Sequence, residues 1–478
     1  MAAKTVLAVD LGAESGRVMA VHYDGHSLQL EELHRFPNTT VTIRGTLYWN
    51  FLRLWENIQT GIDKGKSSNP ASIGVDTWGI DFGLLDKQGD LIGNPVHYRD
   101  NRTEEMMAAT FAKVSKEEVF NQTGIQFMPI NTLYQMVSLV EGQSPHLHIA
   151  DTFLTAPDLL NYWLTGVKVC EFSNATTTQM FNPLTRNWAT PMLEILDIPT
   201  HIFPEVVPPG TRLGNYAGIP VIAPACHDTA SAVAAMPTQS ENFAYISSGT
   251  WSLVGLEVQH PIINEAALLA NVTNEGGVYN TYRLLKNVMG LWILHQCRQT
   301  WAAQGKKYSY DELVSLAQKV PPHQAIIDPD DDRFLPPGNH PQKIKDYCAE
   351  TGQTVPTNTG SIVRIVLESL ALKYRFVLDI LRDLSKQPVD LLYIGGGGAR
   401  NQLLNQLTAN ATGIPVVAGP IEATVIGNAL VQIISLGEIS DILQARQIVA
   451  NMDEIKQYEP EEAALWNAAY ERYKGIVS

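Results

Sequence analysis

The feature that most constrains the fold is a short turn rich in glycine and serine that occurs three times, each time directly after an apolar run. The turns are DLGAESGR at 10–17, SSGTWSLVG at 247–255 and GGGGARN at 395–401, after TVLAVD, ENFAYIS and VDLLYI. An apolar, β-rich run before a tight turn predicts a strand ending there. Small residues let backbone N–H groups approach an anion, and hydroxyl donors are added by Ser15, Ser247, Ser248 and Thr250. One such turn is usually a plain hairpin, but three in one chain favour a bound nucleotide phosphate.

Two widespread phosphate motifs do not fit the sequence. The segment GIDKGKS at 61–67 has three residues between its glycines where a P-loop has four, and no apolar strand precedes it. We interpret it as the exposed end of a helix. In the last turn, Arg400 and Asn401 stand where a dinucleotide-binding fingerprint would have its third glycine. A Rossmann fold is therefore disfavoured.

Length and charge limit the classes of partner. At 478 residues the chain is long enough for two or three domains, at roughly 150 residues per domain. The net charge is −15, with 34 basic and 49 acidic residues. Nucleic acids and anionic membranes require a basic surface, so we expect neither as a partner. An anionic nucleotide would have to be held by local dipoles and a metal ion.

The cysteines and the N-terminal residues indicate the compartment. The four cysteines lie far apart with no C-x-x-C pair, which predicts free thiols rather than a zinc site or a disulfide framework. The apolar stretch VLAV before Asp10 is too short for a signal peptide. No segment reaches the roughly 20 apolar residues of a membrane span. The sequence therefore predicts a soluble cytoplasmic protein.

The predicted elements begin twice along the chain. Two or three strands over 5–33 precede helical spacing from Phe51, and 103–200 is mostly helical. After Pro237, a strand, the SSGTW turn and a second strand repeat this opening. An amphipathic helix at 361–384 and a strand, glycine turn, helix and strand over 390–419 complete the second half. The pattern predicts an α/β protein with a duplicated lobe and two domains, 1–240 and 241–478.

With these features identified, the chain resembles the FGGY carbohydrate kinases from about residue 4 to about residue 435. The motifs are VDTWGIDFGLLD at 75–86, HYRDNR at 97–102, ACHDTASAV at 225–233, ISSGTWSLVG at 246–255 and NVMGLW at 287–292. They look like the branch of the family that phosphorylates L-rhamnulose. The resemblance implies a two-lobed, actin-like fold of duplicated ribonuclease-H-like domains, with ATP and Mg²⁺ in the interlobe cleft. It also implies transfer of phosphate from ATP to the sugar's 1-hydroxyl.

The resemblance assigns two acidic residues to the chemistry. Asp228, between PVIAPAC and a helix of small residues, matches the family's catalytic aspartate and is expected to act as general base. The alternative for this residue is a helix N-cap. Asp10, at the end of the first strand, is expected to orient hydrated Mg²⁺, which needs only one or two carboxylates. Its alternative is a turn-capping aspartate.

The same resemblance predicts contacts to both substrates. The residues expected to contact ATP are Ala13, Glu14, Ser15, Gly16, Arg17, Thr250, His295, Gly395, Gly396 and Gly397. Of these, His295 stands where related kinases lead us to expect glutamine. The residues expected to contact the ketose are Gly83, His227, Asp228, Thr229 and Asn287, with the missing side chain of Gly83 leaving room for the sugar. Trp78 is interpreted as a core residue.

Two other functions fit parts of the pattern. A kinase for another deoxyketose, such as L-fuculose, would share the fold, the base and the ATP turns, and would differ only in sugar contacts. A catalytically silent sugar sensor on the same fold would lack the base or have broken phosphate turns. Asp10, Asp228 and the glycines are all present, which favours the enzyme.

Overall fold

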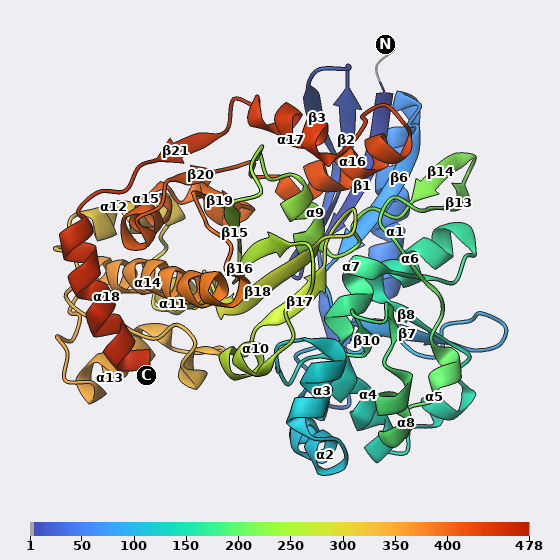
Figure 1. Cartoon of the computed structure of the whole chain (residues 1–478), viewed down its shortest axis with the longest axis horizontal. Helices are drawn as coiled ribbons and strands as arrows, with labels where there is room; N and C mark the ends of the chain where they lie inside the picture. The colour runs from blue at the N-terminus through green and yellow to red at the C-terminus, as the bar shows by residue number, and fades with distance from the viewer. Residues whose placement is uncertain (1–3, 478) are drawn as a thin grey trace. The chain divides into compact units, whose positions relative to one another are not determined.

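The computed structural model describes residues 4–477 and divides the chain into two compact units (Figure 1). The first unit runs up to Gln239 and takes in two later segments, Glu257–Leu284 and Ala423–Met452. The second unit comprises Ser240–Leu256, Leu285–Glu422 and the chain from Asp453 onward. The division predicted from the sequence, 1–240 and 241–478, differs from this one because it assigns Glu257–Leu284 and Ala423–Met452 to the second domain. No described helix is long and apolar enough to cross a membrane.

The first unit is built on a six-stranded sheet in the order β13–β14–β6–β1–β2–β3. Strands β1, β6 and β14 are parallel, and the other three run antiparallel to their neighbours. The carboxyl ends of the three parallel strands therefore meet at one edge of the sheet. The bounds are β1 (Lys4–Leu11), β2 (Ser15–Tyr23), β3 (Leu28–Pro37), β6 (Ser72–Thr77), β13 (Arg212–Tyr216) and β14 (Ile219–Ile222).

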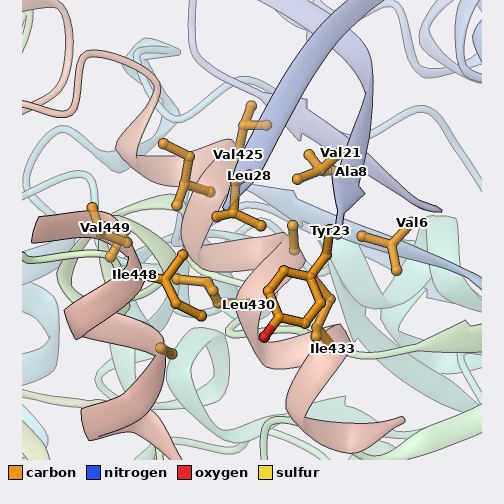
Figure 2. Packing of buried hydrophobic residues seen from close by; sticks show 14 of the residues in the cluster. Val6, Ala8, Val21, Tyr23, Leu28, Val425, Leu430, Ile433, Ile448 and Val449 are labelled. Atoms are coloured by element: carbon orange, nitrogen blue, oxygen red, sulfur yellow. The ribbon is translucent and has the colours of Figure 1, made fainter. Parts of the chain in front are cut away.

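One face of this sheet is covered by two helices from late in the sequence, α16 (Ala423–Ser435) and α17 (Ile442–Ala450). Figure 2 shows Val6, Ala8 and Val21 of the sheet together with Leu430 and Ile433 of α16. Alternate strand residues point to opposite faces, so the residues between these face the other way. On that other side, helix α1 (Phe51–Gly65) packs against β2 and β3. The late segment thus completes the core of the first unit.

Helix α16 makes polar contacts with the sheet, and one of its glycines lies against a neighbouring helix. Gln432 accepts a hydrogen bond from Ser72 Oγ at 2.6 Å and donates one to the Leu7 carbonyl at 3.1 Å. A Cβ at Gly427 would overlap the backbone of Ser231 in α9 (Asp228–Ala234). Only glycine allows the two helices to lie this close. The contacts fix α9, and with it Asp228, relative to the sheet.

The rest of the first unit is mostly helical, as the sequence predicts for 103–200. Its helices are α2 (Met106–Lys113), α3 (Lys116–Thr123), α4 (Thr132–Glu141), α5 (Pro145–Ile149), α6 (Ala156–Thr165), α7 (Phe172–Ala175), α8 (Thr190–Ile195) and α10 (Glu265–Ala270). Its short strands are β4 (Thr40–Ile43), β5 (Thr46–Trp49), β7 (Phe82–Leu85), β8 (Thr152–Thr155), β9 (Cys170–Glu171), β10 (Phe181–Asn182), β11 (Asn187–Trp188), β12 (Val206–Val207) and β17 (Thr273–Gly276). Helix α6 ends at Gly166, whose φ of 77° makes it the predicted C-cap.

The second sheet has seven strands in the order β17–β18–β16–β15–β19–β20–β21. Its further strands are β15 (Phe243–Ser248), β16 (Trp251–Val258), β18 (Tyr282–Met289), β19 (Leu391–Gly395), β20 (Val416–Ala418) and β21 (Lys456–Tyr458). The helices of the second unit are α11 (Trp292–Ala303), α12 (Tyr310–Gln318), α13 (His340–Glu350), α14 (Thr359–Ser385), α15 (Gln402–Thr412) and α18 (Ala463–Val477). The predicted helix at 361–384 is confirmed as α14.

The glycine-rich turns lie where the sequence predicts, each directly after a strand. The first two join antiparallel strands, β1 to β2 and β15 to β16. The third leads from β19 into a 3-10 turn, Gly397–Arg400, and then α15. The segment GIDKGKS is the end of α1, as predicted.

Candidate active site

Acidic residues gather at the edge of the first sheet where its parallel strands end. Asp10 of β1 lies opposite Asp76 of β6 in the parallel register. The next residue of β6, Thr77, forms a bridge with His227, which directly precedes Asp228. The fold therefore places these acidic groups and His227 along one edge, the position where open α/β sheets bind ligands.

Asp228 is the first residue of α9 rather than its cap. The N-cap is His227, whose side chain makes no capping hydrogen bond. The Asp228 side chain is 30% exposed, and its Oδ1 accepts a hydrogen bond from Thr229 Oγ1 at 3.1 Å. Burial, the proximity of His227 and that of Asp10 act on its carboxyl group, and the net effect is a raised pKa. A raised pKa improves a carboxylate as a proton acceptor.

Asp10 is held by Arg17 from the neighbouring strand. The Asp10 side chain is nearly buried, and its Oδ2 accepts hydrogen bonds from Arg17 Nε at 2.9 Å and Nη2 at 2.5 Å. The two residues face each other in the β1–β2 register. Two hydrogen bonds to one oxygen fix the orientation of the carboxylate. The Asp10 oxygen therefore bonds to an arginine side chain, whereas a turn-capping aspartate would bond to backbone N–H groups.

Asp76 is a buried acid that the sequence analysis missed. Its side chain is fully buried, and one oxygen accepts a hydrogen bond from Asn428 Nδ2 at 2.5 Å. Burial, followed by the charge of Asp10, raises its pKa well above the ordinary value. The signal was present, because ASIGVD and TVLAVD are both apolar strands that end in aspartate.

The first glycine-rich turn is closed by local hydrogen bonds. Gly12 N donates to Ser15 O at 2.9 Å, and Asn38 N donates to Glu14 O at 3.0 Å. Ala13 and Glu14 lie in the turn, and Ser15 begins β2. A Cβ at Gly16 would overlap the ring of Phe36. Glycine at position 16 therefore also serves core packing, and its contact with ATP stays a prediction.

The second unit has the other two glycine-rich turns. Thr250 follows Gly249 between β15 and β16, and its carbonyl accepts hydrogen bonds from Gly290 N and Trp292 N, both at 3.2 Å. Gly395 ends β19 opposite Ser247 of β15. Next, Gly396 has a φ of 81°, a value that favours glycine.

Comparisons with known proteins agree with this arrangement. Residues 5–235 match the N-terminal domain of the FGGY family of carbohydrate kinases, and residues 244–436 match its C-terminal domain. The chain belongs to the FGGY family of carbohydrate kinases. This confirms the resemblance drawn from the sequence motifs.

The similar FGGY proteins cover nearly the whole chain. A rhamnulokinase of Bacteroides thetaiotaomicron is 44% identical, over 98% of this chain and 99% of its own length. One of Pectobacterium atrosepticum is 42% identical, over 100% of this chain and 97% of its own.

Solved structures confirm the fold. A xylulose kinase of Lactobacillus acidophilus has a TM-score of 0.81 at 19% identity, covering 99% of this chain and 97% of its own. A glycerol kinase of Plasmodium falciparum has 0.77 at 17%, covering 98% of each chain. The two-domain, actin-like α/β fold of FGGY sugar kinases is thereby confirmed.

Gly83 of this FGGY kinase lies close to two leucine side chains. It lies in β7, and a Cβ there would contact Leu159 at 2.9 Å and Leu91 at 3.0 Å. Its missing side chain makes room for these leucines, and the contact of Gly83 with the ketose stays a prediction. Nearby, the backbone N–H of Trp78 donates to the Leu11 carbonyl at 3.1 Å. That hydrogen bond places the turn after β6 beside the end of β1.

Trp78 is a core residue, as interpreted from the sequence. Its ring is buried and lies 4.1 Å from that of Trp49, centroid to centroid. Both indole N–H groups donate to Asp81 Oδ2, at 2.9 Å from Trp78 and 2.5 Å from Trp49. Burial raises the pKa of Asp81 to about 6.

His295 and Asn287 lie in the second unit. His295 is a half-buried residue of α11, and its two ring nitrogens lie 3.3 Å from Tyr310 Oη and 2.8 Å from Gln299 Nε2. Asn287 is half-buried in β18. Its neighbour Lys286 has its pKa lowered to about 8 by burial.

Proposed function

We propose that this FGGY kinase transfers the γ-phosphate of ATP to the 1-hydroxyl of L-rhamnulose, giving L-rhamnulose 1-phosphate and ADP. The observation that carries the proposal is similarity to rhamnulokinases over nearly the whole chain, at 44% and 42% identity. The local geometry is consistent with it, since Asp228 has the burial and the acidic surroundings expected of a general base.

Asp228 takes the proton in this reaction. Its carboxylate accepts the proton of the sugar's primary hydroxyl as the oxygen forms a bond to the γ-phosphorus. The bond from that phosphorus to the β,γ-bridging oxygen breaks, and ADP leaves with the electron pair. The transition state needs mainly positioning and charge neutralisation, which a single carboxylate does not provide.

Mg²⁺ fits the residues at Asp10. This ion prefers oxygen ligands, keeps several waters and usually needs only one or two carboxylates when phosphates share it. Asp10 offers one carboxylate, whose orientation Arg17 fixes through Oδ2. Within residues 4–477 no three His, Cys, Asp or Glu side chains are grouped as a metal site, which suits an ion held largely by nucleotide and water. When bound, Mg²⁺ neutralises charge on the transferring phosphate.

We assign the nucleotide to the glycine-rich turns. Backbone N–H groups of Ala13–Arg17 and the hydroxyl of Thr250 are the phosphate donors, and Gly395–Gly397 lie against adenosine, where bare backbone accommodates a flat base. His295 is the weakest member of this set, because its ring nitrogens already lie within hydrogen-bonding distance of Tyr310 and Gln299.

We assign the ketose to Gly83, His227, Asp228, Thr229 and Asn287. A polyol requires several short polar groups around it, and His227 and Thr229 directly flank the base.

A coupled ADP-release assay with Mg-ATP tests the proposal. The panel contains L-rhamnulose, L-fuculose, L-ribulose, D-xylulose and glycerol. The highest kcat/KM is expected on L-rhamnulose. A preference for L-fuculose or another ketose would keep the chemistry and overturn the substrate. If no sugar stimulated ADP release, the chain would be a silent sugar sensor instead.

A further inference from the structure

A buried ion pair lies next to the His227 ring in the first unit. Glu275 is in β17 and Arg283 is in the neighbouring strand β18. Arg283 is completely buried, and its Nη2 donates to Glu275 Oε2 at 2.9 Å. Its Nε donates to the Gly276 carbonyl at 2.9 Å. The guanidinium is therefore fixed both by the carboxylate and by the backbone.

Both members of this pair contact one edge of the His227 ring. Nδ1 of His227 lies 3.2 Å from Glu275 Oε2 and 3.0 Å from Arg283 Nη2. On the opposite edge, Nε2 lies 3.5 Å from Asp228 Oδ1. The backbone N–H of His227 donates to Ser173 Oγ at 3.1 Å. The imidazole thus lies between the buried ion pair and the candidate base.

The pair suits either protonation state of Nδ1. A carboxylate only accepts hydrogen bonds and a guanidinium only donates them. When Nδ1 carries a proton, it donates to Glu275, and when it does not, it accepts from Arg283. Burial alone would raise the pKa of Glu275, but Arg283 and His227 outweigh it and lower that pKa, so the carboxylate stays ionised. Nδ1 of the ring therefore has a hydrogen-bonding partner in either case, and the ring does not need to move.

We propose that Glu275 and Arg283 are positioning residues that hold the His227 imidazole against Asp228 and so fix how the ketose hydroxyl meets the base. The proposal rests on the proposed function, in which His227 contacts the sugar. A buried ion pair is a costly way to stabilise a core, because both charges lose their hydration. A specific task at His227 gives a reason for its presence here.

A second buried ion pair in the same unit provides a matched control. Arg446 of α17 donates from Nη1 and Nη2 to the two carboxylate oxygens of Glu257, at 2.9 and 3.0 Å. The two side chains are 5% and 10% exposed, so the burial resembles that of Glu275 and Arg283. Glu257→Gln therefore removes the negative charge that pairs with a buried arginine, as Glu275→Gln does. Unlike Glu275, Glu257 makes no hydrogen bond or ion pair with His227 among the described residues.

The experiment compares E275Q and E257Q in the full chain. We expect similar losses of thermal stability in both variants. In E275Q, kcat/KM for the ketose should fall about ten- to hundredfold with KM for ATP unchanged, whereas E257Q should keep wild-type kinetics. In an H227A background, adding E275Q should cause no further loss, because its effect acts through His227. E275D, which keeps the charge, should recover part of the activity.

A spectroscopic measurement separates this proposal from the choice of substrate. The ¹⁵N signals of the His227 ring, assigned by their loss in H227A, should shift in E275Q and stay unchanged in E257Q. Unchanged His227 signals in E275Q, or equal and additive losses in the H227A background, would overturn the positioning role. A wild type that prefers another ketose would overturn the proposed substrate alone, and the kinetics would then be measured on that ketose.

Discussion

The two strand-turn-strand hairpins, β1–β2 and β15–β16, share a topology and differ in chemistry. In each, the first strand pairs antiparallel with the second and parallel with a later strand, β6 or β19. In the first hairpin, the residue before the last of the strand is Asp10, which faces Arg17 on one side and Asp76 on the other. In the second hairpin that position is Ser247, which faces Leu253 and Gly395.

In the proposed function, this difference lets one scaffold support two kinds of site. Charged groups at the end of the first hairpin suit a cation and a proton transfer. Glycines and hydroxyls at the second suit an anion, because backbone N–H groups are then accessible. Burying several acids together is costly, and the raised pKa values of Asp76 and Asp228 reflect that cost. Topology fixes where the positions lie, and residue type decides what they do.

Asp228→Asn should have the largest effect at the acidic site, because it removes the proposed general base. The amide cannot accept the sugar's proton, so kcat should fall about a thousandfold while sugar binding, measured by calorimetry, persists. In the wild type, kcat/KM should fall as pH decreases through the pKa of the base. Because that pKa is raised, the acid limb should lie at a higher pH than the ordinary pKa of an aspartate would give. Wild-type turnover in the variant would exclude Asp228 as the base.

Asp10→Asn and Ser247→Ala compare the two equivalent positions directly. Losing the carboxylate at position 10 should lower kcat about a hundredfold and raise the Mg²⁺ concentration needed for half-maximal rate. Losing one hydroxyl at position 247 should change kcat only a few-fold. The measurement is a Mg²⁺ titration of initial rates for both variants. Equal effects at the two positions would show that the hairpins are not specialised in this way.

Neighbouring glycines of the third turn separate nucleotide contact from folding. A Cβ at Gly397 has no atom within 4 Å, whereas one at Gly398 would overlap the Ser248 side chain. Gly397→Ala should therefore unfold at the wild-type temperature but raise KM for ATP about tenfold, because in the proposed site the methyl group would meet adenosine. Gly398→Ala should lower the unfolding temperature, through about 1–3 kcal/mol of overpacking. An unchanged KM in Gly397→Ala would remove that glycine from the site.

The sequence predicted the strands, the turns and the family, and failed where the answer depends on three-dimensional neighbours. Asp228 and Asp10 were assigned from the family resemblance together with their places beside apolar runs, and their roles stay predictions. At Gly83 nothing local shows that Leu159 and Leu91 lie where its side chain would be. Glu275 and Arg283 were missed because they meet His227 only through the pairing of β17 with β18. The return of α16 to the first unit has no signal in sequence order.

Asp76→Asn tests the smallest term in the comparison, the cost of ionising a buried acid beside Asp10. In the folded protein the pKa of Asp76 is raised above its unfolded value, so ionisation disfavours the folded state. The protonated Asp76 side chain therefore makes its full contribution to stability at low pH, and this contribution is lost as pH rises through the raised pKa. Asparagine resembles the protonated acid and can still accept the hydrogen bond from Asn428. We expect the variant to unfold about 2–4 °C higher than the wild type at pH 8, with the difference shrinking at pH 5. Asp63→Asn, at an exposed position of α1, should show no such pH-dependent gain. A less stable Asp76→Asn at pH 8 would mean that the carboxylate is stabilised in the fold, and that the first hairpin bears its acidic cluster at no cost.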